Sequence, residues 1–441
     1  MLSEDFISSV CGPPLSSNTA VSKDVGIYCH TLSPAYSVKS TFKKSATPVN
    51  CLTLNDTHVF AAQNEKAYVH VYSRLRGNQE AFVSYPERVR CLTLAGEDVL
   101  VVGTAEGRLM LWEVCTGRLV STPPRHVQAV SCVVAGPYHL ISGSDDSDIH
   151  VWSLSRLLDL GSTAEHEPDH SLRNHRAAIT SLAVGQSANP DTSICVSASK
   201  DKSCIIWNYA SGEVLRTLLF PAAPLCIALD PSSRAVFASS EDGSLYLIEL
   251  YSGSRPLLGP GAEDGSTVVQ VSSPFGVVPS DAGPASTLAL SYDGTLLLTG
   301  HPKGQIMKWD VADNRTPVEM ANLNAAVTNI LFVPPLQEKK PTMTPTVVKP
   351  SQMEMQYTFT SQLEAESGTE TSRFQTLLRA TGFPQVVLED AVAAFQQPAA
   401  DSAAEQDLAR QNEELWEVIK EQKALQKETL QKYMDAKEGC S

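Results

Sequence analysis

The sequence predicts an all-β fold made of seven similar units closed into a ring, followed by a linker and a C-terminal α-helix. Two observations support this prediction. One motif of apolar strand, polar turn and alternating strand recurs along most of the chain. From Asp401 to Lys437 the chain is instead rich in Ala, Glu, Gln, Lys and Leu and contains no Gly or Pro, which is typical of a long helix.

The repeated motif is clearest in "HLISGSDDSDIHVWSL" and returns as "CVSASKDKSCIIWNY", "LLTGHPKGQIMKWDV", "VVGTAEGRLMLWEV" and "ASSEDGSLYLIEL". Weaker copies are "FAAQNEKAYVHVYSR" and "VSKDVGIYCHTL". Each copy ends in an aromatic or bulky residue, and these residues are Tyr28, Tyr72, Trp112, Trp152, Trp207, Ile248 and Trp309. They recur about every 40 residues where no insertion intervenes.

A repeat of this period and ending resembles the WD-repeat β-propeller family, over residues 4–333. The resemblance implies a seven-bladed propeller in which each unit is one four-stranded blade. In this family a Trp, an earlier Ser or Thr, an Asp and a His from the preceding loop form a buried hydrogen-bonded tetrad. The complete set occurs twice, as His126, Ser142, Asp146 and Trp152, and as His175, Ser197, Asp201 and Trp207.

We interpret Asp146 and Asp201 as structural rather than catalytic, because a carboxylate can accept hydrogen bonds from turn amides and an imidazole. The other repeats depart from the pattern. The Asp position holds Glu106, Lys303, Lys66 or Ser22, and the Ser position holds Val102 or Ala238. No nucleophile, paired-acid or phosphate-loop constellation stands elsewhere, so the sequence predicts no catalytic residue, no metal site and no cofactor.

The first unit lacks an inner strand, because "FISSVC", "VGIYCHTL" and "SVKSTF" supply only three. The missing strand appears at the far end of the repeats as "VTNILFVPP". We therefore predict that residues 327–333 complete the first blade and close a domain of residues 1–333. Closure removes exposed sheet edges and couples both ends of the domain.

Two insertions interrupt the period, at "SRLLDLGSTAEHEPDHSL" and at "GSRPLLGPGAEDGSTVVQVSSPFGVVPSDAGP". The first gathers His166, Glu167, Asp169, His170 and His175, which invite a metal-site interpretation, but their spacing matches no known ligand set. We expect both insertions to be loops on the rim, where repeat proteins often bind their partners.

Residues 334–398 are expected to be a linker with short docking segments, of which "PPLQEKKPTMTPTVVKPSQ" is too rich in Pro and Thr to form a packed element. Residues 399–438 are predicted to form a coiled-coil helix with an apolar stripe. The self-association residues on it are Leu408, Leu415, Trp416, Ile419 and Leu425. Such a stripe requires a partner helix, from a second copy or another subunit, unless the helix folds back on the ring.

The composition excludes several classes of protein. A net charge of -15 argues against a chain that coats nucleic acid or an anionic membrane. Ten cysteines without a regular framework favour a reducing compartment. The start "MLSEDFISSVCGPP" does not read as a secretory signal, and no apolar run is long enough for a bilayer. We expect an intracellular protein without a membrane anchor.

A closer resemblance covers nearly the whole chain. The stretches "HVQAVSCVVAGPYHLISGSDDSDIHVWSLSRLLDL" and "IIWNYASGEVLRTLLFPAAPLCIALDPSSRAVFASSEDGSLYLIEL", together with the terminal helix, are similar to the fungal WD-repeat pre-rRNA-processing family and its animal counterparts. The resemblance implies a non-enzymatic scaffold in the nucleus, in both nucleolus and nucleoplasm. It would support removal of the second internal transcribed spacer and maturation of large ribosomal subunit precursors.

The partners implied by this resemblance are an armadillo-like repeat subunit, other subunits of the same complex, a midasin-type AAA ATPase and the pre-ribosomal large-subunit particle. A homodimer through the terminal helix is also implied. Fold alone does not name a function. The alternative is a WD-repeat adaptor of another complex, such as a ubiquitin-ligase substrate receptor or a signalling scaffold.

Overall fold

The computed structural model divides the chain into two units, Met1–Gly382 and Phe383–Ser441. It describes residues 4–13, 15, 25–33, 35–159, 166–185, 193–251, 256–259, 268–312, 316–333, 347–350 and 402–438, with α4 side chains only at 410 and 412–429. The part of the expected linker and docking segments between residues 351 and 398 lies outside the described residues, as does Ser22.

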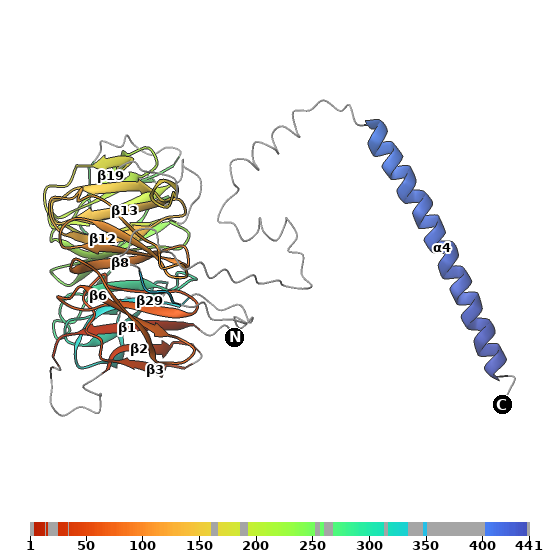
Figure 1. Cartoon of the computed structure of the whole chain (residues 1–441), viewed down its shortest axis with the longest axis horizontal. Helices are drawn as coiled ribbons and strands as arrows, with labels where there is room; N and C mark the ends of the chain where they lie inside the picture. Colours follow the sequence, from red (N-terminus) through yellow and green to blue (C-terminus); the bar gives the residue numbers. More distant parts are fainter. Residues whose placement is uncertain are drawn as a thin grey trace. The chain divides into compact units, whose positions relative to one another are not determined.

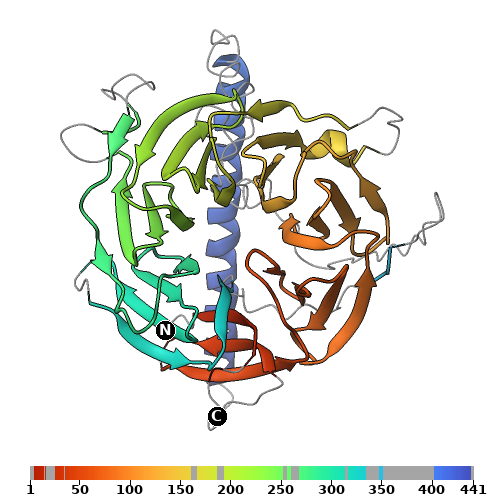
Figure 2. The ribbon, with the colours of Figure 1, turned by 90° about the vertical axis from the view of Figure 1, so that its left-hand side faces the viewer.

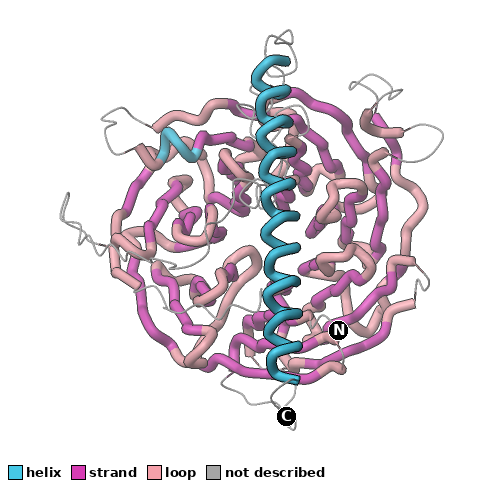
Figure 3. Tube along the Cα trace, turned by 90° about the vertical axis from the view of Figure 1, so that its right-hand side faces the viewer, coloured by secondary structure: helices cyan, strands magenta, loops and turns pink. Residues whose placement is uncertain are grey.

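Seven sheets form the blades of a ring, which confirms the predicted seven-bladed β-propeller (Figure 2). Each blade contains an antiparallel sheet, and the innermost strands of neighbouring blades contact one another. Around the ring almost every described segment is strand, turn or loop (Figure 3). From the inner edge outwards, blade 1 contains β29 (Ala326–Phe332), β1 (Asp5–Cys11), β2 (Val25–Thr31) and β3 (Ser37–Lys43).

The next blades follow the chain in order. Blade 2 contains β4 (Leu52–Leu54), β5 (His58–Ala62), β6 (Tyr68–Ser73) and β7 (Gln79–Ser84). Blade 3 contains β8 (Val89–Ala95), β9 (Val99–Thr104), β10 (Leu109–Glu113) and β11 (Leu119–Ser121). Blade 4 contains β12 (Val130–Ala135), β13 (His139–Ser144), β14 (Ile149–Ser153) and β15 (His170–Leu172).

The last three blades show the same order. Blade 5 contains β16 (Ile179–Val184), β17 (Ile194–Ser199), β18 (Ser203–Asn208) and β19 (Glu213–Leu219). Blade 6 contains β20 (Pro224–Leu229), β21 (Ala235–Ser240), β22 (Ser244–Glu249) and β24 (Gly276–Val277). Blade 7 contains β25 (Thr287–Leu290), β26 (Leu296–Gly300), β27 (Gln305–Asp310) and β28 (Val318–Asn322).

Strand β29 closes the ring from the far end of the repeats. It pairs antiparallel with β1, with Phe332 opposite Phe6 and Ile330 opposite Ser8. The sheet order β29-β1-β2-β3 therefore joins residues separated by almost the full length of the domain. Because this strand comes from the far end of the repeat region, blade 1 has all four of its strands only when the two ends of the ring meet.

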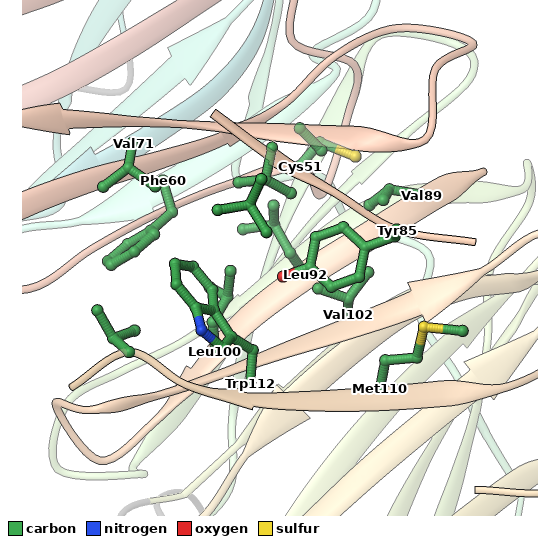
Figure 4. Packing of buried hydrophobic residues seen from close by; sticks show 14 of the residues in the cluster. Cys51, Phe60, Val71, Tyr85, Val89, Leu92, Leu100, Val102, Met110 and Trp112 are labelled. Atoms are coloured by element: carbon green, nitrogen blue, oxygen red, sulfur yellow. The ribbon is translucent and has the colours of Figure 1, made fainter. Parts of the chain in front are cut away.

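The core of the ring consists of seven apolar clusters, each shared by two neighbouring blades. Figure 4 shows the cluster between blades 2 and 3, in which Trp112 packs near Phe60 and Leu100. Side chains alternate between the two faces of a strand, so each repeat-ending residue faces the preceding blade. One such residue lies in each cluster: Tyr28, Tyr72, Trp112, Trp152, Trp207, Ile248 and Trp309.

A belt of seven hydrogen bonds joins the blades, one across each boundary. In every case a hydroxyl or thiol on an inner strand, or on the residue directly before it, donates to a backbone carbonyl of the next blade. The pairs are Cys51 to Arg90 (3.2 Å), Cys91 to Val130 (3.4 Å), Ser131 to Ile179 (2.7 Å), Thr180 to Pro224 (2.9 Å), Cys226 to Ala285 (3.6 Å), Ser286 to Val327 (2.6 Å) and Thr328 to Thr47 (2.6 Å).

The cysteines of the belt are buried thiols. Burial raises the pKa of Cys51 and of Cys226 to about 12, so both stay protonated and can donate, although a thiol is a weak donor. The nine cysteines in the described part of the chain are all free. Six of them are buried and act as small side chains of the core: Cys51, Cys91, Cys132, Cys195, Cys204 and Cys226.

The two insertions contain regular structure, so the expectation that they are only loops was wrong. The first begins with a short helix, α1 (Leu154–Leu157). The second forms β23 (Val268–Gln270), which adds to blade 5 as a fifth strand parallel to β19, and it also contributes β24 to blade 6. Buried arginines hold both insertions, because Arg118 donates to the Leu158 carbonyl at 2.8 Å and Arg216 donates to the Leu257 carbonyl at 2.7 Å.

The second unit contains the helix α4 (Ser402–Glu438) (Figure 1). Its sequence has no Pro and no interior Gly, which favours a continuous helix. Among the helices described, none combines the length and the apolar character needed to cross a bilayer.

Candidate functional site

The first tetrad lies at the junction of blades 3 and 4. The Trp152 indole nitrogen, on β14, donates to the Ser142 hydroxyl, on β13, at 3.0 Å. The Ser142 hydroxyl lies 2.9 Å from His126 Nε2, and His126 Nδ1 lies 3.4 Å from Asp146. The four side chains therefore follow one another from the core of the blade to the turn that joins β13 to β14, with hydrogen bonds as far as the imidazole and an ion-pair contact from His126 to Asp146.

The second tetrad has the same order in blade 5. The Trp207 indole donates to Ser197 at 2.8 Å, Ser197 lies 2.7 Å from His175 Nε2, and His175 Nδ1 lies 3.0 Å from Asp201. An ionised carboxylate can only accept, so His175 must donate from Nδ1 and accept at Nε2 from the serine. The tetrad thus has a single direction of donation, from indole to hydroxyl to imidazole to carboxylate.

Both aspartates also close a turn. Asp146 accepts from the Val127 amide at 2.8 Å and from the Asp148 amide at 2.9 Å. Asp201 accepts from the amides of Arg176 and Ser203, each at 2.9 Å. Each carboxylate therefore connects two segments of backbone that would otherwise bury unsatisfied amides.

These contacts determine the protonation state of the aspartates. Burial by itself would raise the pKa of both carboxyl groups. Hydrogen bonds from the imidazole and the turn amides outweigh burial and hold both pKa values well below the ordinary value of an aspartate. A carboxylate this acidic is a poor general base, and its side chain is only 10% exposed in Asp146 and 14% in Asp201.

Blade 7 carries a variant tetrad that sequence reasoning missed. The Trp309 indole donates to the Thr299 hydroxyl at 3.1 Å, and Thr299 lies 2.8 Å from His301 Nε2. His301 then donates from Nδ1 to the Gly283 carbonyl at 2.9 Å, so a backbone carbonyl replaces the aspartate. The sequence did contain one signal, a Thr ten residues before a Trp. The histidine, however, stands two residues after that Thr, directly behind β26, whereas in the two complete tetrads it comes from the loop before the blade.

Blade 3 keeps only the tryptophan of the tetrad. Val102 occupies the Ser position on β9, and the Trp112 indole donates instead to the Val348 carbonyl at 3.0 Å. Val347 and Val348 belong to "PPLQEKKPTMTPTVVKPSQ", and they lie against blade 3 without forming a helix or a strand. Val347 packs against the apolar cluster of blades 2 and 3.

The acidic and histidine-rich insertion does not gather its side chains around one point. Asp169 pairs with Arg156 at 2.5 Å, Glu167 pairs with Arg125 at 3.0 Å, and His170 bonds the Ala210 carbonyl at 3.0 Å. Within the described residues no group of three or more His, Cys, Asp or Glu side chains is arranged to hold a metal ion.

The helix α4 presents large apolar side chains to solvent. The exposed fractions are 60% for Leu415, 61% for Trp416, 51% for Val418, 41% for Ile419 and 61% for Leu425. Leu408 lies in α4, but its side chain is outside the described part of the helix. Several exposed apolar residues at helical spacing are typical of a surface that another helix covers.

Comparison with known proteins identifies the repeats. The family model described as "WD domain, G-beta repeat" matches residues 117–153 and 166–208, which contain the two complete tetrads. The chain contains WD repeats, and the seven sheets of its ring form a seven-bladed β-propeller. In solved structures, the propeller is similar to the computationally designed Ika8 protein, with a TM-score of 0.52 and 18% identity over 73% of this chain and 90% of that one, a similarity that shows the fold alone.

Relatives of the chain include an animal WD repeat-containing protein and two yeast pre-rRNA-processing proteins. WD repeat-containing protein 18 of Danio rerio is 28% identical over 64% of this chain, and the pre-rRNA-processing protein IPI3 of Yarrowia lipolytica is 30% identical over 62% of it. The pre-rRNA-processing protein crb3/ipi3 of Schizosaccharomyces pombe is 27% identical over 64% of the chain. The match spans 64% of the length of each of the first two relatives, and 69% of the third.

Proposed function

We propose that this WD-repeat propeller is a non-enzymatic scaffold subunit of a nuclear complex that processes pre-rRNA and matures large ribosomal subunit precursors. The observation that carries the proposal is the homology to the yeast pre-rRNA-processing proteins and to the animal WD repeat-containing protein 18. In this proposal the protein supports removal of the second internal transcribed spacer, and it resides in the nucleolus and nucleoplasm.

The chemistry of the described residues supports a scaffold. The two tetrad aspartates are occupied by amides and imidazoles, and their depressed pKa values make them poor proton acceptors. The cysteines of the belt have raised pKa values and are buried, so they are poor nucleophiles. The tetrads of His126, Ser142, Asp146 and Trp152 and of His175, Ser197, Asp201 and Trp207 serve, in this proposal, to brace the blades.

The proposed organisation has three parts. The propeller, residues 1–333, presents its rim to the partners. Residues 334–398 connect it to the helix of residues 399–438, which carries the self-association residues Leu408, Leu415, Trp416, Ile419 and Leu425. The exposed apolar side chains at 415, 416, 419 and 425 support a helix pair, because water contact with so many of them is unfavourable.

The proposed partners are an armadillo-like repeat subunit, other members of the same complex, a midasin-type AAA ATPase and the pre-ribosomal large-subunit particle. A tagged full-length chain, purified from cells at moderate salt, tests this. Recovery of large-subunit precursors together with the ATPase is expected. Recovery of cullin components or of a signalling complex in their place would overturn the proposal and favour an adaptor function.

A second measurement tests the processing step directly. Depletion of the protein should cause precursor RNA that retains the second internal transcribed spacer to accumulate, and re-expression of the wild-type chain should reverse this. A chain with Asp201→Asn that folds at the growth temperature should also reverse it, because the aspartate braces a blade and does no chemistry. Failure of that folded variant alone would indicate a catalytic or binding function for the carboxylate.

A further inference from the structure

Three blades satisfy the indole of their tryptophan internally. Trp152, Trp207 and Trp309 each donate to a hydroxyl ten residues earlier, at 3.0, 2.8 and 3.1 Å. Trp112 stands at the same place in blade 3, where Val102 lies ten residues before it and offers no acceptor. Its side chain is nevertheless fully buried, with 0% exposure.

The missing acceptor comes from a segment far along the chain. The Trp112 indole donates to the Val348 carbonyl at 3.0 Å, across 236 residues of sequence. The Val348 amide donates in turn to the Val114 carbonyl at 2.9 Å. Both backbone groups of Val348 are therefore held at the end of β10, and the buried Trp112 indole does not remain an unsatisfied donor.

The turn between β10 and β11 is shaped to receive this segment. Gly117 has a φ of +76°, and a Cβ on it would lie 2.8 Å from Val348 Cγ1 and 2.9 Å from the Lys349 carbonyl. Any other residue at position 117 would therefore collide with the segment. On the other side, Val347 packs against the cluster that contains Phe60 and Trp112.

We propose that the rim of blade 3 is a docking site for a segment of the chain's own tail, at the place where Val102 leaves the Trp112 indole without an acceptor inside the blade. The occupant is Val347–Lys349, held in cis by the Trp112 indole and the Val114 carbonyl. The chain leaves the ring beside blade 1, where the Val333 amide donates to the Asp5 carbonyl at 2.9 Å. Because Val347–Lys349 is held at blade 3, the chain that continues to α4 starts from blade 3 and not from blade 1. This inference does not depend on the proposed function in ribosome assembly.

The test uses the full-length chain with its tryptophan indoles observed by NMR in deuterated protein. The Trp112 signal is assigned by its absence in Trp112→Phe. Val348→Pro removes the amide donor and distorts the docked segment, so we expect it to shift the Trp112 indole signal and leave those of Trp152, Trp207 and Trp309 in place. An unmoved Trp112 signal would overturn the proposal.

A second variant places the hydroxyl back in the blade. Val102→Ser offers Trp112 the same acceptor that Ser197 offers Trp207, so one of the two bonds holding the segment is lost. Hydrogen exchange of the Val348 amide should then accelerate about fivefold, as expected for a hydrogen bond worth about 1 kcal/mol. The matched control is Ala238→Ser, which adds a hydroxyl at the equivalent position of blade 6, where Ile248 replaces the tryptophan.

Exchange of the Val348 amide should be unchanged in Ala238→Ser. Equal acceleration in both serine variants would show that the exchange reports general destabilisation of the ring, and it would count against a site at blade 3. Exchange of this amide at the rate of an unprotected peptide in the wild-type chain would rule out the docked segment altogether.

Discussion

The Thr328 hydroxyl donates to the Thr47 carbonyl at 2.6 Å, although 281 residues separate them in sequence. This bond is the last link of the belt, because it connects the closing strand β29 to the second blade. The same hydroxyl lies 3.0 Å from Ser9 Oγ, within the sheet that β29 completes. The two ends of the repeat region are therefore joined to each other and to the next blade at one residue.

Thr328→Val should lower the free energy of unfolding of the whole ring by about 1–2 kcal/mol, because it leaves the buried Thr47 carbonyl unsatisfied. Thr180→Val removes the link between blades 5 and 6 and should shift the same transition by a similar amount. Urea unfolding followed by circular dichroism measures both. Two separate transitions, or an effect of Thr180→Val only, would contradict a ring that unfolds as one unit.

Ile330→Asp should be far more disruptive, because Ile330 is 2% exposed in the cluster of blades 1 and 7 and an unpaired buried charge is strongly unfavourable. We expect loss of the folded ring at moderate temperature. The matched control is Val318→Asp on β28, where the valine is 61% exposed. A melting temperature equal in the two variants would show that β29 does not hold the ring closed.

Ser197→Ala should cost about 1–3 kcal/mol, because it leaves the Trp207 indole and the His175 ring without their shared partner. The double variant with Trp207→Phe should cost less than the sum of the single changes, since the two residues contact each other directly. Ser232→Ala on an exposed turn is the control and should be neutral. Strict additivity of Ser197→Ala and Trp207→Phe would contradict a hydrogen-bonded tetrad.

Acidification from about pH 6.5 toward pH 4 should destabilise the propeller, because two buried histidines resist protonation in the folded chain. Burial lowers the pKa of His30 and of His150 from 6.5 to about 4 in the folded chain. Between these values the unfolded chain takes up protons that the folded chain does not. The free energy of unfolding is therefore highest above about pH 6.5 and falls as the pH drops toward 4. Each histidine contributes up to about 1.4 kcal/mol to this loss for every unit by which folding lowers its pKa.

His150→Asn tests the assignment, because asparagine does not titrate and still offers a polar group to Ser171, which lies 3.0 Å from His150 Nδ1. The slope of stability against pH between 4 and 6.5 should become shallower in this variant. Thermal melts at several pH values measure the slope. An unchanged slope would show that His150 is not a source of the acid sensitivity.

The triple variant Leu408→Asp, Leu415→Asp and Ile419→Asp should abolish self-association through α4. A charge on this stripe would be buried without a partner in a helix pair. Ala424→Asp is the control, because at about 100° per residue position 424 lies opposite Leu415 on the helix. Light scattering after size exclusion should give half the wild-type mass for the first variant only, with the melting temperature of the propeller unchanged. A monomeric wild-type chain would refute the homodimer.

The repeat, its seven copies and the two complete tetrads were all readable from the sequence. These features depend on the alternation of apolar and polar residues within a strand and on the spacing between a Trp and its Ser, as in Trp207 and Ser197, which lie within one blade. The strand of residues 326–332 could also be recognised, because it matches the inner strand of every other repeat.

Only the tertiary structure decided where the remaining hydrogen bonds go. The belt pairs the Cys51 thiol with the carbonyl of Arg90, and backbone carbonyls have no signature in a sequence. In the same way His301 finds the Gly283 carbonyl in place of an aspartate, and Trp112 finds Val348. Local pattern determines which residues a strand buries, whereas the partner of a buried donor depends on which distant backbone the closed ring places within about 3 Å of it.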